Sequence, residues 1–418
     1  MRPSRRPDCL RTILSALDLA VYWMQSCLVS VGYKTDVADA RISRLADLIV
    51  DYSLELKPGQ VFRIDALDAA SPLTLAFYRS AIRAGAFPYF SVGLEGTLEL
   101  LLEHGTKEQI EYIAPQQWQE IEEIDAIATI WSEANTRALS RVDPARHANY
   151  LAAQRRLHNR RWERIAGGEM RWCGTLFPTN AHAQDAGMSL SSYEDFVYSA
   201  CHVDTGEAAD HWWLVASSLR ARAQELNAVK ELRILGPDTD LRVSVDGRSW
   251  ISAEGTYNMP DGEVFTSPVE TATEGEIRYT FPAIYHGREV EDIRLRFESG
   301  SVVHAEAARG DDYLKTLLDM DKGARILGEV AFGLNYEIDR FTRNILFDEK
   351  IGGTMHLALG SAFTQAGGNN TSGLHWDMIC DLREDGEVYA DGELVWKAGR
   401  FLHEPVPAPD PVEAAERA

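Results

Sequence analysis

Hydrophobic positions in the first half of the chain follow two spacings in turn. Apolar side chains three and four positions apart indicate amphipathic helices, and the short apolar runs between them indicate strands. These segments alternate along the chain in the order 42–56, 61–66, 71–85, 88–94, 106–124 and 125–132. Because strands that alternate with helices pair in parallel, this half predicts an open α/β domain with a mostly parallel sheet.

The pattern changes near Leu235. Beyond it, short alternating runs are separated by Asp-Gly, Gly-Arg and Ser-Gly pairs, which is typical of antiparallel β-hairpins. These runs occupy residues 241–255, 276–308 and 387–401. One segment with a helical pattern, residues 311–321, interrupts them. We therefore predict an α/β domain over residues 41–235 and an α+β domain, rich in antiparallel hairpins, over residues 236–403.

The two ends of the chain depart from this pattern. Three arginines precede an apolar stretch within residues 1–40, and Asp18 and Gln25 interrupt that stretch. It is too polar for a membrane span, which needs about 20 predominantly apolar residues, and it lacks a clean small-residue cleavage site. We interpret residues 1–40 as an atypical extension, either an appended helix or the product of a start codon assigned too early. Residues 404–418 are rich in proline and are expected to form a loose tail.

The composition excludes some partners and favours one compartment. The 418 residues carry a net charge of −22, which argues against nucleic acid as a partner because nucleic-acid surfaces need Lys and Arg. The five cysteines are few, odd in number and lack C-x-x-C spacing. They are typical of reduced thiols in a cytoplasmic protein. No membrane partner is expected.

Candidate chemistry appears in residues 347–381, where His356, His375 and Asp377 lie among six glycines. In a strand, side chains two positions apart leave the same face, so His375 and Asp377 would point one way and their apolar neighbours the other. Such a strand would carry half of a metal site. A histidine in an apolar strand is also typical of a hydrogen-bonded core residue, so His356 alone does not decide between the two interpretations.

Two carboxylates upstream strengthen the case for a metal. Glu263 follows a Pro-Asp-Gly turn and begins a strand-like run, and Glu329 stands between two apolar runs. A buried carboxylate must be paired or bind a metal. A turn cap or a salt-bridged residue at the rim would explain either glutamate by itself.

Four motifs, taken together, resemble the metallo-aminopeptidase family of aminopeptidases T and S. They are NMPDGEVFTSP (258–268), GARILGEVAFGLN (323–335), LFDEKIGGTMHLALG (346–360) and SGLHWDMICDLR (372–383). Two further stretches, RALSRVDPAR (137–146) and LFPTNAHAQDAGMSLSSYEDFVYSAC (176–201), are similar to the same family. The resemblance spans roughly residues 41–403 and keeps the motifs in order.

This resemblance implies the parts of an active site. The family's metal ligands fall on five positions, Glu263, Glu329, His356, His375 and Asp377. They imply two divalent ions bridged by a carboxylate, for which Glu329 is the best candidate, and nitrogen with oxygen ligands suits Zn, Co or Mn. Glu263 is either a ligand or the general base, and the sequence leaves both roles open. The resemblance further implies an aminopeptidase of short peptides, or of small amides, that acts as a homodimer.

One position departs from the family pattern. The resemblance implies a tyrosine three residues after the glycine of the HxALG motif, and Phe363 stands there. The aromatic ring is kept, but the hydroxyl group is lost. The donor is then supplied elsewhere, the activity is low, or the substrate differs.

Other functions are weighed against this one. The chain has no HExxH or G-x-S-x-G motif, so it does not match helix-borne zinc proteases or serine hydrolases. His356, His375 and Asp377 alone would form the two-histidine, one-carboxylate set of a mononuclear Fe(II) ring-cleaving dioxygenase. Hydrolysis of a non-peptide amide is a further alternative, and a binding protein that has lost catalysis is the last.

Overall fold

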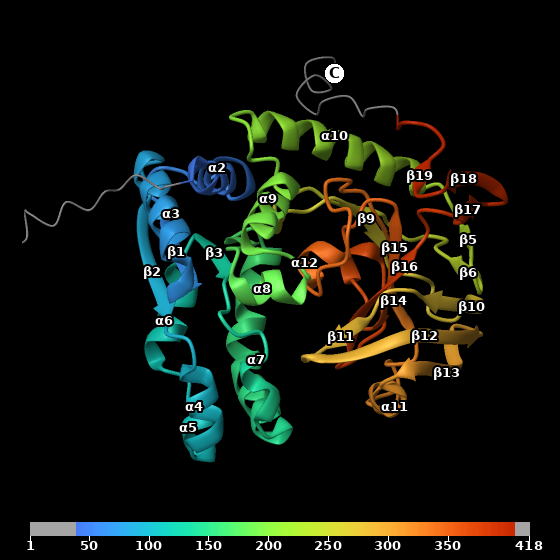
Figure 1. The fold of residues 1–418 in the computed structure, drawn as a ribbon, viewed down its shortest axis with the longest axis horizontal. Helices are drawn as coiled ribbons and strands as arrows, with labels where there is room; N and C mark the ends of the chain where they lie inside the picture. Colours follow the sequence, from blue (N-terminus) through green and yellow to red (C-terminus); the bar gives the residue numbers. More distant parts are fainter. Residues whose placement is uncertain (1–38, 406–418) are drawn as a thin grey trace, which may run out of the picture. The chain divides into compact units, whose positions relative to one another are not determined.

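The computed structural model describes residues 39–405 (Figure 1). Most of the predicted N-terminal extension and of the predicted loose tail lies outside the described residues. The predictions for those two segments therefore remain predictions.

A five-stranded parallel sheet forms the first part of the described chain. Its strand order is β2-β1-β3-β4-β8, and every neighbouring pair is parallel. The strands are β1 (Val61–Leu67), β2 (Phe87–Gly93), β3 (Ala126–Trp131), β4 (Arg171–Leu176) and β8 (Asn258–Met259). The predicted parallel α/β architecture is confirmed.

Helices connect these strands, as the alternating pattern predicted. They are α2 (Ala40–Leu48), α3 (Ser71–Arg83), α4 (Thr97–His104), α5 (Lys107–Ile110), α6 (Pro115–Glu123), α7 (Pro144–Ala166), α8 (Asn180–Asp185), α9 (Leu190–Ala200) and α10 (Ala208–Leu226). A π-helical turn (Ile49–Ser53) follows α2. In α3 the buried residues Leu73, Phe77 and Ala81 recur every four positions, so one face packs inward. No helix in the described part of the chain is both long and apolar enough to cross a membrane.

The chain then forms a nine-stranded sheet in which every pair is antiparallel. Its order is β11-β12-β10-β6-β5-β17-β18-β19, with β13 beside β12. The strands are β5 (Glu231–Gly236), β6 (Thr239–Ser244), β10 (Thr273–Tyr279), β11 (Ala283–Tyr285), β12 (Arg288–Glu298), β13 (Ser301–Arg309), β17 (Glu387–Ala390), β18 (Glu393–Lys397) and β19 (Arg400–Phe401). This sheet confirms the predicted antiparallel hairpins. The domain boundary near Leu235 would fall inside β5 and remains a prediction.

A third sheet, of five antiparallel strands, carries the candidate residues. Its order is β16-β15-β14-β9-β7. The strands are β7 (Ile251–Ala253), β9 (Glu263–Thr266), β14 (Leu327–Gly333), β15 (Thr354–Gly360) and β16 (His375–Asp381). Two short helices, α11 (Asp311–Leu318) and α12 (Ile345–Asp348), lie between its strands in sequence.

The two antiparallel sheets share one hydrophobic core. Val330, Leu357 and Trp376 from the five-stranded sheet belong to the same buried cluster as Ile234 and Leu295 from the nine-stranded sheet. Because side chains alternate along a strand, the residues next to these core residues leave the opposite face of the five-stranded sheet. Every residue of β14 and β15 is buried, so that opposite face is covered as well.

Candidate metal centre

The five residues singled out by the sequence lie on one face of the five-stranded sheet. His356 pairs with Ala331, and Ala358 pairs with both Glu329 and Asp377, so these positions share a face. The pairing of Gly333 with Glu263 adds β9 to the same face. His375 shares it because it lies two residues before Asp377 on β16. The alternation predicted for His375 and Asp377 is therefore present in the strand.

Glu329 faces two histidines with its two carboxylate oxygens. Its Oε1 lies 3.6 Å from Nε2 of His356, and its Oε2 lies 3.3 Å from Nε2 of His375. These distances exceed the usual hydrogen-bond range of about 2.7–3.2 Å. The Glu329 carboxylate thus lies between two imidazole nitrogens and is too far from each for an ordinary hydrogen bond.

The other ring nitrogen of each histidine contacts a backbone carbonyl. Nδ1 of His356 lies 2.9 Å from the carbonyl oxygen of Glu349, and Nδ1 of His375 lies 2.9 Å from that of Ser361. A carbonyl oxygen only accepts, so each Nδ1 donates and each Nε2 is directed into the cluster. Histidines that bind metals through Nε2 are commonly oriented in this way.

Glu263 and Asp377 complete the set with oxygens that lack hydrogen bonds. Oε2 of Glu263 is 3.5 Å from Nε2 of His356, and Oδ1 of Asp377 is 3.6 Å from Nε2 of His375. Neither of these buried oxygens has a hydrogen-bond partner among the described residues. Leaving such an atom unsatisfied costs about 1–3 kcal/mol, so these oxygens are suited to a cation.

Three charged residues that the sequence analysis missed join the cluster. Glu349 groups with His356 and Asp377 at metal-ligand spacing. Lys350 is fully buried, and its Nζ pairs with Oε1 of Glu349 and lies 4.0 Å from Oδ1 of Asp261. For Glu349 and Lys350 the sequence does contain a signal, because they belong to a run of charged residues, Asp-Glu-Lys at 348–350, shortly before an apolar strand.

The cluster is open on the side of His375. The side chain of His375 is 33% exposed to solvent, whereas that of His356 is 1% exposed. The ring of Phe363 lies edge-on against the His375 imidazole, with ring centroids 5.3 Å apart. The position where the resemblance implies a tyrosine therefore borders the open side.

A comparison of the sequence with known families decides what this cluster belongs to. The pattern that defines the thermophilic metalloproteases (M29) matches residues 38–401. The chain belongs to the M29 metalloprotease family. The resemblance drawn from the four motifs is confirmed, and residues 38–401 include all five predicted positions and the three additional ones.

Known members of this family are similar over nearly their whole length. Aminopeptidase 2 of Geobacillus stearothermophilus is 29% identical over 412 residues, which cover 88% of this chain and 98% of that protein. Aminopeptidase T of Thermus thermophilus is 26% identical over 416 residues, covering 88% and 100%. A solved structure titled wild-type AmpT from Thermus thermophilus superposes with a TM-score of 0.77 over 87% of this chain and 99% of that chain, at 26% identity. The fold is therefore that of an M29 metalloprotease.

The geometry of the cluster fits metal ions. Two ligand atoms that each lie about 2.1 Å from the same tetrahedral ion are about 3.4 Å apart. The nitrogen–oxygen separations of 3.3–3.6 Å around Glu329, Glu263 and Asp377 agree with that spacing. Two groups with suitable ligand atoms are present, Glu329–His375–Asp377 and Glu349–His356–Asp377. The buried carboxylates and imidazoles can therefore hold the metal that an M29 metalloprotease requires.

The mutual effects of these groups appear in their pKa values. Burial lowers the pKa of His356, but the nearby carboxylates of Glu329 and Glu263 outweigh it and raise the pKa to about 10. Burial raises the pKa of Glu329, but His356 and His375 outweigh it and hold the pKa at about 2. Burial raises the pKa of Asp377 to about 6 despite the opposing charge of His375. Without a metal, the carboxylates of the cluster therefore stabilise the positively charged form of His356.

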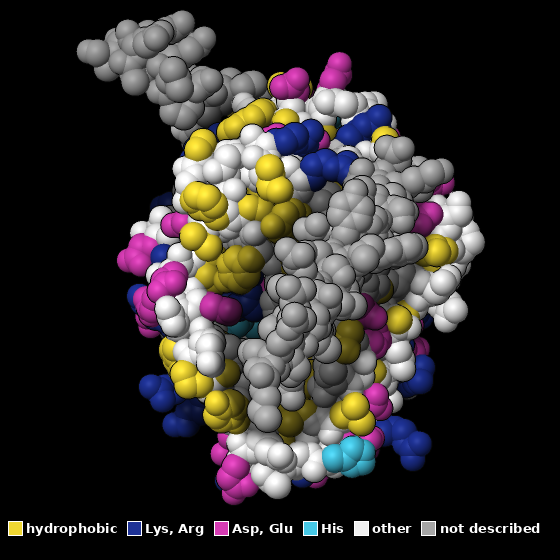
Figure 2. All heavy atoms as spheres, turned by 90° about the vertical axis from the view of Figure 1, so that its left-hand side faces the viewer, with side chains coloured by type: hydrophobic (Ala, Val, Ile, Leu, Met, Phe, Trp, Pro, Cys, Tyr) yellow, Lys and Arg dark blue, Asp and Glu magenta, His cyan; other side chains and the backbone are white. Residues whose placement is uncertain are grey.

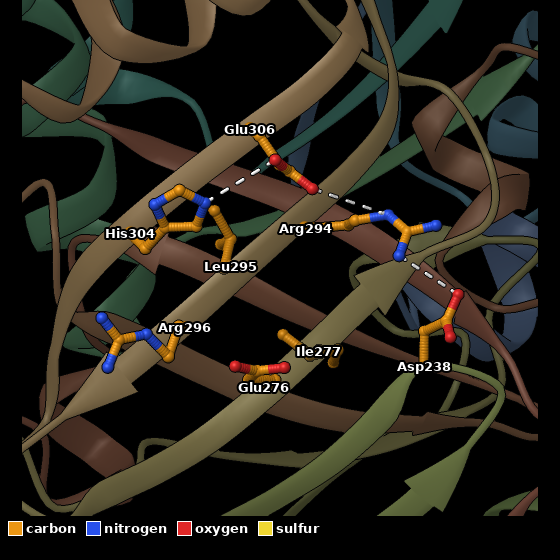
Figure 3. A pocket seen from close by; sticks show the side chains of 8 residues that line it. All are labelled: Asp238, Glu276, Ile277, Arg294, Leu295, Arg296, His304 and Glu306. Atoms are coloured by element: carbon orange, nitrogen blue, oxygen red, sulfur yellow. Dashed lines mark ion pairs between the residues drawn. The ribbon is translucent and has the colours of Figure 1, made fainter.

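A hollow elsewhere on the surface has a different character. It measures about 280 Å³ and lies over strands β10, β12 and β13. Figure 3 shows Arg294 between Asp238 and Glu306, at 3.2 and 3.9 Å, and His304 beside Glu306 at 3.6 Å. Its charged groups pair with one another across neighbouring strands, as the solvent face of an antiparallel sheet commonly does. None of the predicted site residues lines it.

Proposed function

We propose that this M29 metalloprotease is a metal-dependent aminopeptidase that removes the N-terminal residue from short peptides. The observation that carries the proposal is the position of Glu329, whose two oxygens face His356 and His375. A carboxylate placed between two histidines is suited to bridge two ions. The similar proteins from Geobacillus and Thermus are named aminopeptidases, which supports the same activity here.

We assign the ligands of two divalent ions, Zn, Co or Mn, from the two groups. His356 and Glu349 would hold one ion, with Glu263 beside them, and His375 would hold the other. Glu329 would bridge the two ions, and Asp377, which belongs to both groups, would be the second carboxylate able to contact both. Nitrogen and oxygen donors of this kind suit these three metals.

The chain's own residues supply substrate binding and proton transfer. When bound, the divalent ions lower the pKa of a water molecule and polarise the scissile carbonyl. The excess of carboxylates attracts the positively charged amine of a peptide N-terminus. Burial raises the pKa of Glu263 well above its usual range, against the opposing charge of Lys350. Because its carboxylate lies beside the metal-binding groups, Glu263 is either a ligand of the metal or the general base that takes the proton of the water molecule.

Phe363 supports one alternative substrate. Without a hydroxyl group at this position, the centre lacks the donor that the family pattern implies, and a small non-peptide amide becomes the second candidate. A mononuclear Fe(II) dioxygenase fits less well, because Glu263, Glu329 and Glu349 add three carboxylates to the two histidines and Asp377 that such an enzyme needs.

We also propose a homodimer. Within residues 39–405, strand β2 lies at the edge of the parallel sheet and pairs only with β1. Exposed apolar side chains gather on α3 and β2, namely Leu75, Ile82, Phe87 and Phe90. Figure 2 shows hydrophobic side chains on the side of the structure to which α3 and β2 belong. An exposed apolar patch beside an unpaired edge strand is suited to a second copy of the chain.

A cytoplasmic location is proposed from the cysteines. Cys173, Cys201 and Cys380 are free and buried, and free buried thiols agree with a reducing compartment. Cys9 and Cys27 lie outside the described residues.

The experiment that tests the function measures metal and turnover together. Protein purified without chelator is analysed for metal content per chain and assayed on aminoacyl anilides with added Co²⁺ or Zn²⁺. Close to two ions per chain with metal-dependent release of the aniline is the expected result. One iron per chain with consumption of O₂, or two ions without aminoacyl turnover, would overturn the aminopeptidase assignment.

A further inference from the structure

Two aromatic rings lie together beside the metal centre. Phe265 is on β9, and Phe363 is in the turn that follows β15. Their ring centroids are 5.0 Å apart and their planes are tilted by 56°. The backbone N–H of Phe363 donates to Oγ of Ser267 at 2.9 Å, so the turn is attached to the end of β9. We call Phe265 and Phe363 the aromatic pair.

The strand pairing places the aromatic pair on the same face as the metal-binding residues. Phe265 lies two residues after Glu263, so both side chains leave one face of β9. Phe265 pairs with Ala331 of β14, and Ala331 pairs with His356 of β15. Along this row of paired residues, only the methyl side chain of Ala331 lies between Phe265 and His356.

The aromatic pair also borders the open side of the centre. The Phe363 ring contacts the His375 ring edge-on, with an interplanar angle of 78°. His375 is the exposed histidine of the cluster, and both rings of the aromatic pair are half-buried. A molecule that approaches the centre past His375 therefore meets apolar aromatic surface first.

The covalent structure of a peptide's N-terminal residue indicates which part of the substrate contacts the aromatic pair. Its Cα atom carries the amine, the scissile carbonyl carbon and the side chain. When the amine and the carbonyl are both held at the centre, the side chain must enter the layer of residues immediately around it. The rest of the peptide leaves through the open side. In that layer, Phe265 and Phe363 supply the large apolar surface beside His375.

We propose that the aromatic pair forms the wall of the pocket that receives the side chain of the peptide's N-terminal residue. This inference rests on the proposed aminopeptidase function. The pocket favours long aliphatic and aromatic side chains over those of glycine and alanine. One extra methylene in a hydrophobic pocket is worth roughly 10-fold or more in kcat/KM, so a preference of at least about 10-fold for leucyl over alanyl substrates is expected.

The test compares substrates that differ only in the N-terminal residue. Glycyl, alanyl, leucyl and phenylalanyl anilides are assayed with the metal-loaded wild type and with Phe265→Ala. The variant should lose on the order of 10-fold in kcat/KM for leucyl and phenylalanyl anilides, mainly through KM, and keep its rates on glycyl and alanyl anilides within about 2-fold. Phe265→Leu, which retains apolar volume, should fall between the two.

Metal content and thermal stability of each variant show whether the centre and the fold are retained. Phe281→Ala is the matched control, because the ring of Phe281 also packs on a second phenylalanine, Phe341, with ring centroids 5.1 Å apart, but outside the aromatic pair. It should keep the wild-type substrate profile. An equal loss on all four anilides, or an unchanged profile, in Phe265→Ala would overturn the inference.

Two further outcomes separate this inference from the proposed function. A wild type that hydrolyses aminoacyl anilides with no preference among them would sink the pocket assignment and leave the aminopeptidase function standing. A wild type that hydrolyses none of them would remove both. A dipeptide series that varies the second residue completes the test: if the loss in Phe265→Ala follows the second residue, the rings receive the leaving part of the peptide and the inference is wrong.

Discussion

The ammonium group of Lys350 lies 3.7 Å from Oε1 of Glu263, and both side chains are buried. Lys350 also pairs with Glu349 and faces Asp261 at 4.0 Å. Burial lowers the pKa of Lys350, but Glu263, Glu349 and Asp261 outweigh it and raise the pKa above its usual range. In the metal-free protein, the positive charge of Lys350 therefore offsets part of the repulsion among these three carboxylates.

Lys350→Met should destabilise the metal-free protein. The substitution keeps an unbranched side chain but leaves two buried carboxylates, Asp261 and Glu263, and the half-buried Glu349 without their cation. Removing one partner of a buried ion pair costs about 3–5 kcal/mol. The free energy of unfolding in urea, measured with chelator, tests this. Lys397→Met is the control, because Lys397 pairs with Glu387 at an exposed position and should cost less than about 1 kcal/mol. Equal losses in the two variants would contradict the prediction.

Glu329→Gln should remove the bound metal and the activity while keeping the fold. The amide retains the shape of the side chain but not its charge, so the proposed contact with the metal is weakened. We expect metal content to fall below half of the wild-type value and kcat/KM to fall on the order of 100-fold or more. His356→Ala should act in the same direction. Glu306→Gln, in the hollow over the nine-stranded sheet, is the matched control. Wild-type metal content and activity in Glu329→Gln would refute the assigned site.

Much of this centre follows from strand periodicity. The shared face of His375 and Asp377 follows from the period of two along a strand, which also puts Trp376 in the core. Glu263 and Glu329 were recognisable because each interrupts an apolar run. The short apolar strands and their turn residues likewise predicted the parallel and antiparallel sheets.

Residues in turns could not be placed in this way. Glu349 lies seven residues before His356, outside β15, and reaches the centre because its own carbonyl oxygen accepts the Nδ1–H of that histidine. Asp261 is held by the N–H of Gly255, at 3.0 Å from Oδ2, in a turn before β9. β8 has two residues, too few to show periodicity, although it joins the parallel sheet beside β4. Tertiary contacts, which local patterns do not contain, determine all three.

Phe363→Tyr should raise hydrolysis of aminoacyl substrates. The ring already lies against His375, so a hydroxyl group added to it would extend along the open side of the centre. A positioned donor contributes on the order of 100-fold in related chemistry, and a gain of about 10-fold in kcat/KM on leucyl anilide is expected. Phe363→Leu removes the ring without adding a donor and should not give this gain. An unchanged rate in Phe363→Tyr would mean that another group already serves as the donor.

Ile82→Glu should weaken the proposed homodimer. Ile82 is exposed on α3, and the Tyr78 ring on the same helix contacts Phe90 of β2 at 6.3 Å, so the apolar surface is continuous between the two elements. A charge placed on this surface must be desolvated when a second copy binds. Sedimentation velocity should show a dimer for the wild type and a shift towards monomer for the variant. Glu103→Gln serves as the control for a neutral change at an exposed helix position. A monomeric wild type would refute the dimer, and a variant that remains dimeric would refute the surface.

His202 should make the folded state less stable in mild acid. Its ring stacks on His211 with centroids 3.6 Å apart, and burial together with the charge of His211 lowers its pKa from 6.5 to about 4, while Glu337 and Asp204 oppose the shift. Between these two pKa values, His202 is protonated in the unfolded chain but not in the folded chain. Its contribution to the free energy of unfolding is therefore fully present above pH 6.5 and is lost as the pH falls towards 4. From about pH 7.5 to about pH 5.5 this group should remove about 1 kcal/mol from the free energy of unfolding, after allowing for partial exposure.

His202→Asn tolerates the positive φ of 56° at this position and should reduce the pH-dependent loss by about that amount. His211→Asn should reduce it in part, because the neighbouring positive charge is gone. Urea unfolding of the three proteins at both pH values measures the difference, and an equal loss in all three would show that the stacked pair does not titrate in this range.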